Sequence, residues 1–160
     1  MDLEQLRALY DREQRIEITY PRLRREETPD VVRHIARPHR ESFVLYSRLN
    51  AENVDRVIEE QITYFSSLGQ TFEWKVYEHD WPDDLRDRLG ARGFDMEDSE
   101  AIMVLDAETA PPIVSSGHHV RRITDPEQLR DVITVLDEVW QSDHSWITYH
   151  LGDELRDNPD

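Results

Sequence analysis

Apolar residues recur along the chain with two different spacings, and the clearest run extends from Asn50 to Phe94. Between residues 54 and 68 they recur every three or four positions, which predicts an amphipathic helix. The apolar positions are Val54, Val57, Ile58, Ile62, Phe65 and Leu68. Asn50 is a candidate N-cap for this helix, and Gly69 follows it where a left-handed residue commonly ends a helix.

A strand and a second helix are predicted next. Residues 71–77 alternate between apolar and polar side chains, which is the period of a strand with one buried face. Pro82 and the acids after it are typical of a helix start, and Leu85 and Leu89 would then face the core. A helix between two strands predicts a crossover unit, and such units place functional clefts at strand ends.

The pattern before this unit is less regular. Residues 2–18 carry apolar side chains on one helical stripe. Residues 22–30 mix arginines with acids, which favours a solvated loop over an anion site. Two strands are predicted at 31–36 and 42–49, and the turn residues between them indicate a hairpin.

Residues 101–105 form a short apolar run that is typical of an interior strand. The stretch 109–117 has the composition of a linker. A further strand is predicted at 120–123, before a helix start at residues 124–127 that combines cap candidates, proline and acid. A short helix is predicted at 145–157. Because this strand–helix–helix tail leaves an apolar face exposed, we expect it to pack on the first domain or on another chain.

Composition narrows the classes of function. The chain has 160 residues, a net charge of −16 and no cysteine, which excludes disulfides and thiolate sites. Residues 78–108 hold 11 acids and 3 arginines, and residues 125–160 hold 10 acids and 2 arginines. Such acidity argues against nucleic-acid binding, which needs clustered basic side chains. With no apolar run of membrane-spanning length and a charged N-terminus, the expected location is the cytoplasm.

The predicted order of hairpin, helix, strand, helix and strand resembles the GCN5-related N-acetyltransferase (GNAT) superfamily. More particularly, it resembles bacterial proteins that carry two GNAT-like domains in tandem. The matching segments are SFVLYSRL, YFSSLGQTFEWKVYEHD, PDDLRDRLGARGF, AIMVLD and VRRITDPEQLRDVITVLDEVW. The resemblance implies an α/β fold with a mixed, mainly antiparallel sheet flanked by helices. It also implies a GNAT-like domain at 1–108, the linker at 109–117, and the start of a second domain at 118–160.

The resemblance further implies transfer of an acetyl group from acetyl-CoA to an amine, in a cleft between the ends of the strands at 42–49 and 72–77. Candidate cofactor-binding residues at this cleft are Tyr46, Arg48, Asn50 and Tyr77. Candidate bases that could deprotonate the amine are Glu73, Glu78 and His79. The acceptor itself is not indicated by any residue.

Two positions depart from the family pattern. The link at 47–53 contains no glycine to let the backbone approach a pyrophosphate, and Glu52 places negative charge there. Leu89 stands where many members carry a tyrosine that protonates the departing thiolate. The first domain is therefore expected to be degenerate, and the resemblance implies a second domain that is incomplete or truncated.

Two functional hypotheses remain open. One is an acetyltransferase-like protein that uses acetyl-CoA. The other is a non-catalytic interaction module, with a homodimer formed through residues 118–160. A metal site is not expected, because none of the 7 histidines forms a helical His-x-x-x-His pair.

Overall fold

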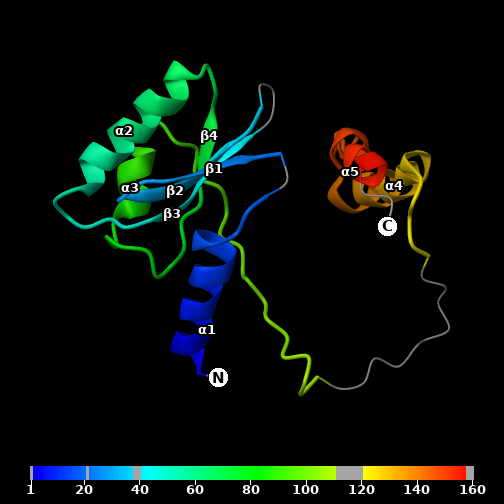
Figure 1. Ribbon diagram of the computed structural model, residues 1–160, viewed down its shortest axis with the longest axis horizontal. Helices are drawn as coiled ribbons and strands as arrows, with labels where there is room; N and C mark the ends of the chain where they lie inside the picture. The colour runs from blue at the N-terminus through cyan, green and yellow to red at the C-terminus, as the bar shows by residue number, and fades with distance from the viewer. Residues whose placement is uncertain (1, 21, 38–40, 111–120, 158–160) are drawn as a thin grey trace. The chain divides into compact units, whose positions relative to one another are not determined.

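The computed structural model describes residues 2–20, 22–37, 41–110 and 121–157. The chain divides into two compact units, Met1–Ala101 and Ile102–Asp160. The first unit is a mixed α/β structure with a sheet flanked by helices, and the second is helical (Figure 1).

The sheet of the first unit has four strands in the order β1-β2-β3-β4. Their bounds are Arg24–Glu27 for β1, Val31–Ile35 for β2, Ser42–Ser47 for β3 and Phe72–Trp74 for β4. The pairs β1–β2 and β2–β3 are antiparallel, and the β2–β3 pair confirms the predicted hairpin. The pair β3–β4 is parallel.

Helix α2 (Val54–Ser67) connects the parallel strands β3 and β4, so the predicted crossover is confirmed. Gly69 follows it with a φ of 66°, the left-handed conformation expected there. Helix α3 (Leu85–Gly90) comes next, and the predicted core positions Leu85 and Leu89 are fully buried. The main core joins the sheet to these two helices and contains Val31, Ile35, Val44, Leu49, Val54, Val57, Ile58, Phe65, Trp74, Leu85 and Leu89.

The opposite face of the sheet carries the N-terminal helix (Figure 1). Helix α1 (Leu3–Tyr10) continues through the π-helix η1 (Asp11–Ile16), which confirms the predicted helix. Asp2 caps it, because its side chain accepts a hydrogen bond from the backbone of Gln5 at 2.8 Å. The fully buried residue of this helix is Arg15, while its apolar residues stay at least partly exposed.

Two predictions in the first unit need correction. Residues 24–27 form strand β1 where a solvated loop was predicted, because its charged side chains are neutralised in place and its backbone pairs with β2. The strand predicted at 71–77 is shorter, since β4 covers Phe72–Trp74. The amide of Lys75 still donates to the Val44 carbonyl at 3.0 Å, and the amide of Tyr77 then donates to the Asp80 side chain in a turn instead of to β3.

The strands predicted at 101–105 and 120–123 are wrong for the described residues. Residues 101–105 and 121–123 belong to no helix or strand, and Met103 is 91% exposed. An apolar run forms a strand only when a neighbouring strand accepts its backbone hydrogen bonds, and no described strand pairs with it. Val120 and most of the predicted linker lie outside the described residues.

The second unit is built from a short 3-10 turn, η2 (Pro126–Gln128), and helices α4 (Leu129–Trp140) and α5 (Ile147–Asp157). Asp125 caps the start by accepting a hydrogen bond from the backbone of Glu127 at 2.9 Å, as its sequence predicts. Leu129 and Ile147 are the buried apolar residues of this helical pair, so its core is small.

Candidate functional site

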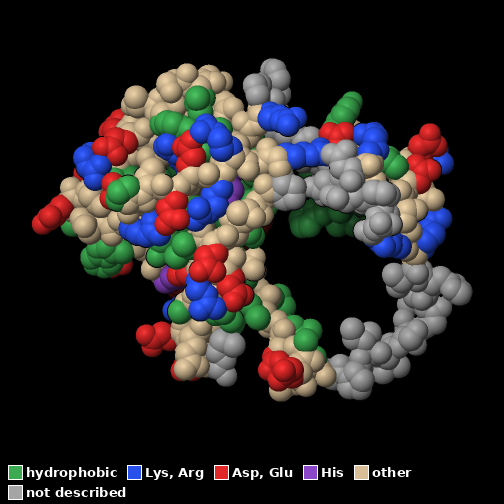
Figure 2. Space-filling view, viewed as in Figure 1, with side chains coloured by type: hydrophobic (Ala, Val, Ile, Leu, Met, Phe, Trp, Pro, Cys, Tyr) green, Lys and Arg blue, Asp and Glu red, His purple; other side chains and the backbone are tan. Residues whose placement is uncertain are grey.

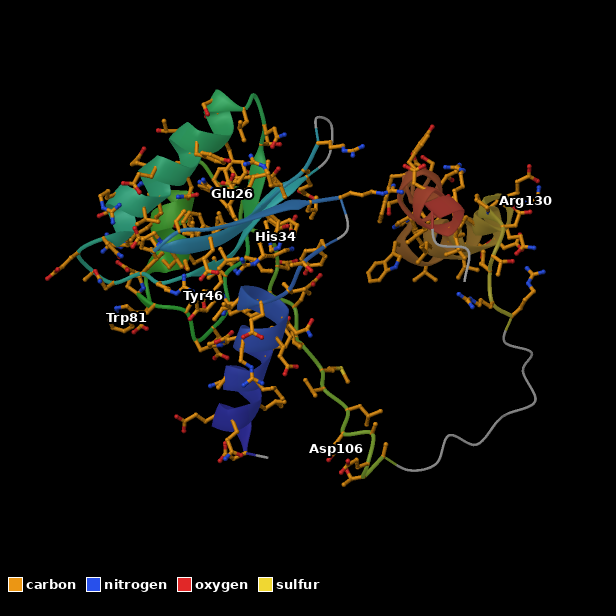
Figure 3. All side chains as sticks on the ribbon, viewed as in Figure 1. Glu26, His34, Tyr46, Trp81, Asp106 and Arg130 are labelled. Carbon is orange, nitrogen blue, oxygen red and sulfur yellow. The ribbon has the colours of Figure 1, made fainter. Side chains whose placement is uncertain are left out.

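A β-bulge in β3 shapes the face of the sheet under α1. Arg33 pairs with Val44, whereas Val32 pairs with Tyr46, so Leu45 is an extra residue in the ladder. The bulge places Tyr46, which is labelled in Figure 3, opposite Val32 in the ladder and hence on the same face. It also directs the carbonyl of Leu45 toward the N-terminal helix.

Arg15 occupies the space under this bulge. Its Nε donates to the Leu45 carbonyl at 3.2 Å, Nη1 donates to Asp11 at 2.7 Å and Nη2 donates to Asp80 at 2.7 Å. The side chain is fully buried. Burial alone would lower the pKa of Arg15, but the hydrogen bonds and charges of Asp80 and Asp11 outweigh it and raise that pKa.

Tyrosine rings enclose the guanidinium group. Its central carbon lies 3.8 Å from the ring centre of Tyr77 and 4.9 Å from that of Tyr46, which is cation–π geometry. The hydroxyl oxygens of Tyr77 and Tyr10 are 3.4 Å apart. Burial and this contact with Tyr10 raise the pKa of Tyr77 above the ordinary value of a tyrosine.

His79 completes the group through Asp11. Its Nε2 lies 2.9 Å from Asp11 Oδ2 and 3.5 Å from Arg15 Nη1. We call this set the Arg15 cluster: Tyr10, Asp11, Arg15, Tyr46, Tyr77, His79 and Asp80. Each guanidinium nitrogen of Arg15 already has an acceptor within the chain, so the cluster fastens the N-terminal helix to the ends of β3 and β4.

Three of the sequence candidates, Tyr46, Tyr77 and His79, therefore come together. The sequence did not reveal Arg15, because Asp11 and Arg15 are four residues apart and read as an ordinary surface pair on a helix. Asp80, which makes the cluster a buried network, is 65 residues away from Arg15 along the chain. No local signal could have linked them.

The other cofactor-binding candidates make separate contacts. Arg48 donates to Glu27 at 2.8 Å and to the carbonyl of Thr28 at 3.3 Å. The Asn50 side chain accepts hydrogen bonds from the backbones of Glu52 at 2.8 Å and Asn53 at 3.0 Å. Asn50 thus caps the turn before α2 rather than α2 itself, whose N-cap residue is Asn53, and the backbone N–H groups of Glu52 and Asn53 have an acceptor within the chain.

The remaining candidate bases lie outside the cluster. Glu73 forms an ion pair with Lys75, the residue two positions further along the chain. The Glu78 side chain is 94% exposed and is 3.9 Å from Arg7. Exposed pairs of this kind contribute little energy, so neither carboxylate is held in a fixed position toward a reactive centre.

A second arginine network lies on the α2 face of the sheet. Arg33 donates to Glu26 through Nη2 at 2.7 Å and to Gln61 through Nη1 at 2.8 Å. Its guanidinium carbon is 3.3 Å from the ring centre of Tyr64, whose hydroxyl donates to Glu26 at 2.9 Å. Burial would raise the pKa of Glu26, but the bonds from Arg33 and Tyr64 lower it overall.

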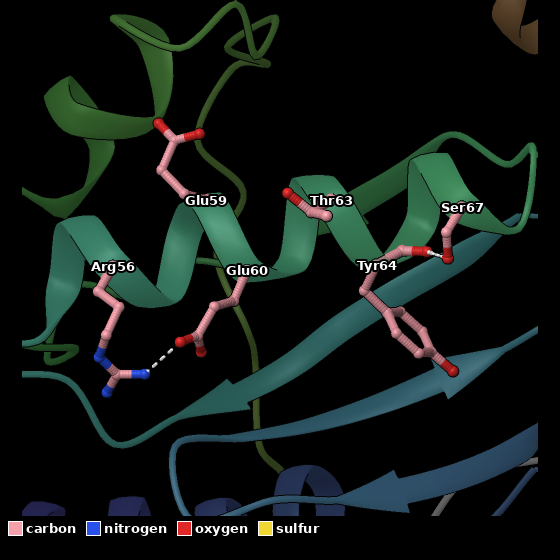
Figure 4. A pocket seen from close by; sticks show the side chains of 6 residues that line it. All are labelled: Arg56, Glu59, Glu60, Thr63, Tyr64 and Ser67. Carbon is pink, nitrogen blue, oxygen red and sulfur yellow. Dashed lines mark hydrogen bonds and ion pairs between the residues drawn. The ribbon is translucent and has the colours of Figure 1, made fainter.

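The outer side of α2 has a shallow depression, lined by Arg56, Glu59, Glu60, Thr63, Tyr64 and Ser67 (Figure 4). Arg56 donates to Glu60 at 2.6 Å and to Asp30 at 3.0 Å. Basic and acidic side chains are similarly interspersed over the visible face of the first unit (Figure 2). Within the described ranges, no cluster of three or more potential metal ligands occurs and no helix is long and apolar enough to cross a membrane.

Comparisons with protein-family models, with curated proteins and with solved structures find no match to this chain.

Proposed function

We propose that this protein is a non-catalytic binding module whose helical second unit contacts a partner. The observation that carries the proposal is the exposure of large apolar side chains on α4, where Val135 is 59% exposed and Val139 is 64% exposed. Trp140 at the end of α4 and Tyr149 on α5 are also exposed. Contiguous exposed apolar side chains in a folded protein commonly mark an interaction surface.

The contacts of the first unit support a scaffold role. In the Arg15 cluster, two carboxylates, a backbone carbonyl and two tyrosine rings surround one cation within the fold. Asn50 likewise engages the backbone ahead of α2. These polar groups contribute to the stability of the unit, since buried charge is tolerated when it is paired and hydrogen-bonded.

The acetyltransferase-like hypothesis gives the second candidate function. It is favoured by the β3–α2–β4 crossover, in which the parallel strands β3 and β4 lie side by side and α2 begins at the end of β3. Its cofactor would be acetyl-CoA, and its acceptor an amine.

A stability measurement tests the binding face. If Val139 is free for a partner, Val139→Glu should change the free energy of unfolding of the full chain by no more than about 0.5 kcal/mol. Leu129→Ala, at a buried position of the same helix, should cost about 2–5 kcal/mol. In a background of Trp74→Phe and Trp81→Phe, fluorescence of Trp140 and Trp146 would follow unfolding of this unit. A cost for Val139→Glu as large as that for Leu129→Ala would show that the face is covered within the chain, and would overturn the proposal.

Thermal melts with CoA and acetyl-CoA distinguish the two candidates. A ligand that binds only the folded state adds about 2.7 kcal/mol at a hundredfold excess over its Kd. We expect no change in Tm with either compound. A rise of several degrees would support the acetyltransferase-like function instead.

A further inference from the structure

We infer that the partner of the α4 face is a cationic amphipathic helix. This inference rests on the proposed function and adds the chemistry of the partner. Val132, Val135 and Val139 are three and four residues apart, so they form one stripe along α4. Leu129 is buried beside this stripe and faces the small core, whereas Val135 and Val139 are exposed.

Acidic side chains flank the other side of the stripe. Asp131 and Glu138 are seven residues apart, so they lie two turns apart on one side of the helix, next to the valines. Both residues are exposed. Asp131 is 3.4 Å from Arg121, but this pair lies in solvent and holds the carboxylate weakly.

The surrounding charge has the same sign. Residues 125–160 contain 10 acids and only 2 arginines. A partner that places lysine or arginine beside its own apolar stripe would therefore gain both steering and complementary contacts. A stripe with this spacing is one helix wide, which matches the ridge of a packed helix.

A second copy of the chain fits this surface less well. Two copies meeting through the same face would bring Asp131 and Glu138 of one toward the same acids of the other. The net charge of −16 on each chain would add to that repulsion.

Three synthetic helical peptides test the inference with the full chain. They share one leucine face and carry lysine, glutamine or glutamate on the polar face, and fluorescence anisotropy reports binding. We expect the lysine peptide to bind about tenfold more tightly than the glutamine peptide, and the glutamate peptide more weakly than both. Added salt should strongly weaken the binding of the lysine peptide, but not the binding of the other two peptides.

Matched variants locate the surface. Val135→Glu and Val139→Glu should abolish binding of the lysine peptide. Thr134→Glu adds the same charge to the same helix, but between Asp131 and Glu138 rather than on the valine stripe, so it should tighten binding of the lysine peptide instead of abolishing it. The double variant Glu138→Gln with Asp131→Asn should lower the affinity for the lysine peptide toward the affinity for the glutamine peptide. Its affinity for the glutamine peptide should not change.

Each other outcome overturns the inference in a distinct way. Equal binding of all three peptides would remove the charge preference but keep an apolar binding face. No binding, together with a dimer in light scattering that Val139→Glu dissociates, would identify a second copy as the occupant. No binding by a monomeric chain would reject the helical partner, while the stability of Val139→Glu would still decide whether the face is free.

Discussion

The two faces of the sheet each hold a buried arginine stacked on tyrosine, but the two differ in their access to water. Arg15, on the α1 face, is paired with Asp11 and with Asp80, whose side chain is only 4% exposed. Arg33, on the α2 face, is paired with Glu26, which is labelled in Figure 3 and whose side chain is 23% exposed. The same pairing of charges therefore stands in a drier environment under α1.

This difference in solvent access matters because removing one partner of an ion pair destabilises the fold most when the remaining charge has no water around it. Removing Arg15 leaves Asp80 with little solvent and with the Tyr77 amide as a remaining donor. Removing Arg33 leaves Glu26 with the Tyr64 hydroxyl, the nearby Arg24 and water. We therefore expect the two substitutions to have unequal costs.

Arg15→Met should have the largest effect, a loss of about 3–5 kcal/mol in the free energy of unfolding. Chemical denaturation followed by circular dichroism would measure it. The double variant Arg15→Met with Asp80→Asn should recover part of the lost stability, because the unpaired charge of Asp80 is then also removed. If Arg15→Met costs no more than an exposed substitution, the cluster does not fasten the helix to the sheet.

Arg33→Met should cost less, about 1.5–3 kcal/mol, as expected for charged hydrogen bonds whose partners keep some solvent. The same denaturation experiment applies, and Arg56→Met on the outer side of α2 serves as an exposed control. A loss equal to that of Arg15→Met would show that solvent access does not distinguish the two faces.

Periodic patterns predicted the elements that have an apolar side. The stripe of α2, the hairpin, and Leu85 and Leu89 follow from local spacing, because each buries its own side chains against a core. Strand β1 was missed, since its sequence RREE has no apolar period and gains its stability from pairing with β2. Residues 101–105 show the reverse case, an apolar run without a strand partner in the described structure.

The candidate site could be predicted only in part. Tyr46, Tyr77 and His79 were expected near the ends of two neighbouring strands, and the parallel pairing of β3 and β4 brings those ends together. Their common neighbour, Arg15, lies in the N-terminal helix, which precedes β1 and β2 in the sequence. The bulge at Leu45 that turns Tyr46 toward it depends on the register of two strands, which has no signature in the spacing of residues.

The smallest expected effect concerns the response of the α1 face to pH. His34 is fully buried between Phe43 and Tyr20, whose ring centres lie 5.1 Å and 5.0 Å from its own. Its Nε2 is 3.3 Å from the carbonyl of Ile18, and Nδ1 has no hydrogen-bond partner among the described residues. Burial lowers the pKa of His34, the bond to Ile18 opposes this, and the charge of Arg25 adds to the lowering.

Because the unfolded chain then binds the proton more readily than the folded chain, His34 should reduce stability as the pH falls below its unfolded pKa of about 6.5. One proton changes the free energy of unfolding by at most about 1.4 kcal/mol per pH unit. Denaturation at pH 7.5 and 5.5 should therefore show a smaller loss in His34→Phe, which keeps the ring packing, than in the wild type. His79→Gln controls for a second histidine on this face. An unchanged slope in His34→Phe would mean that His34 takes up its proton equally well in the folded chain, and that the α1 face is less dry than the contacts of Arg15 imply.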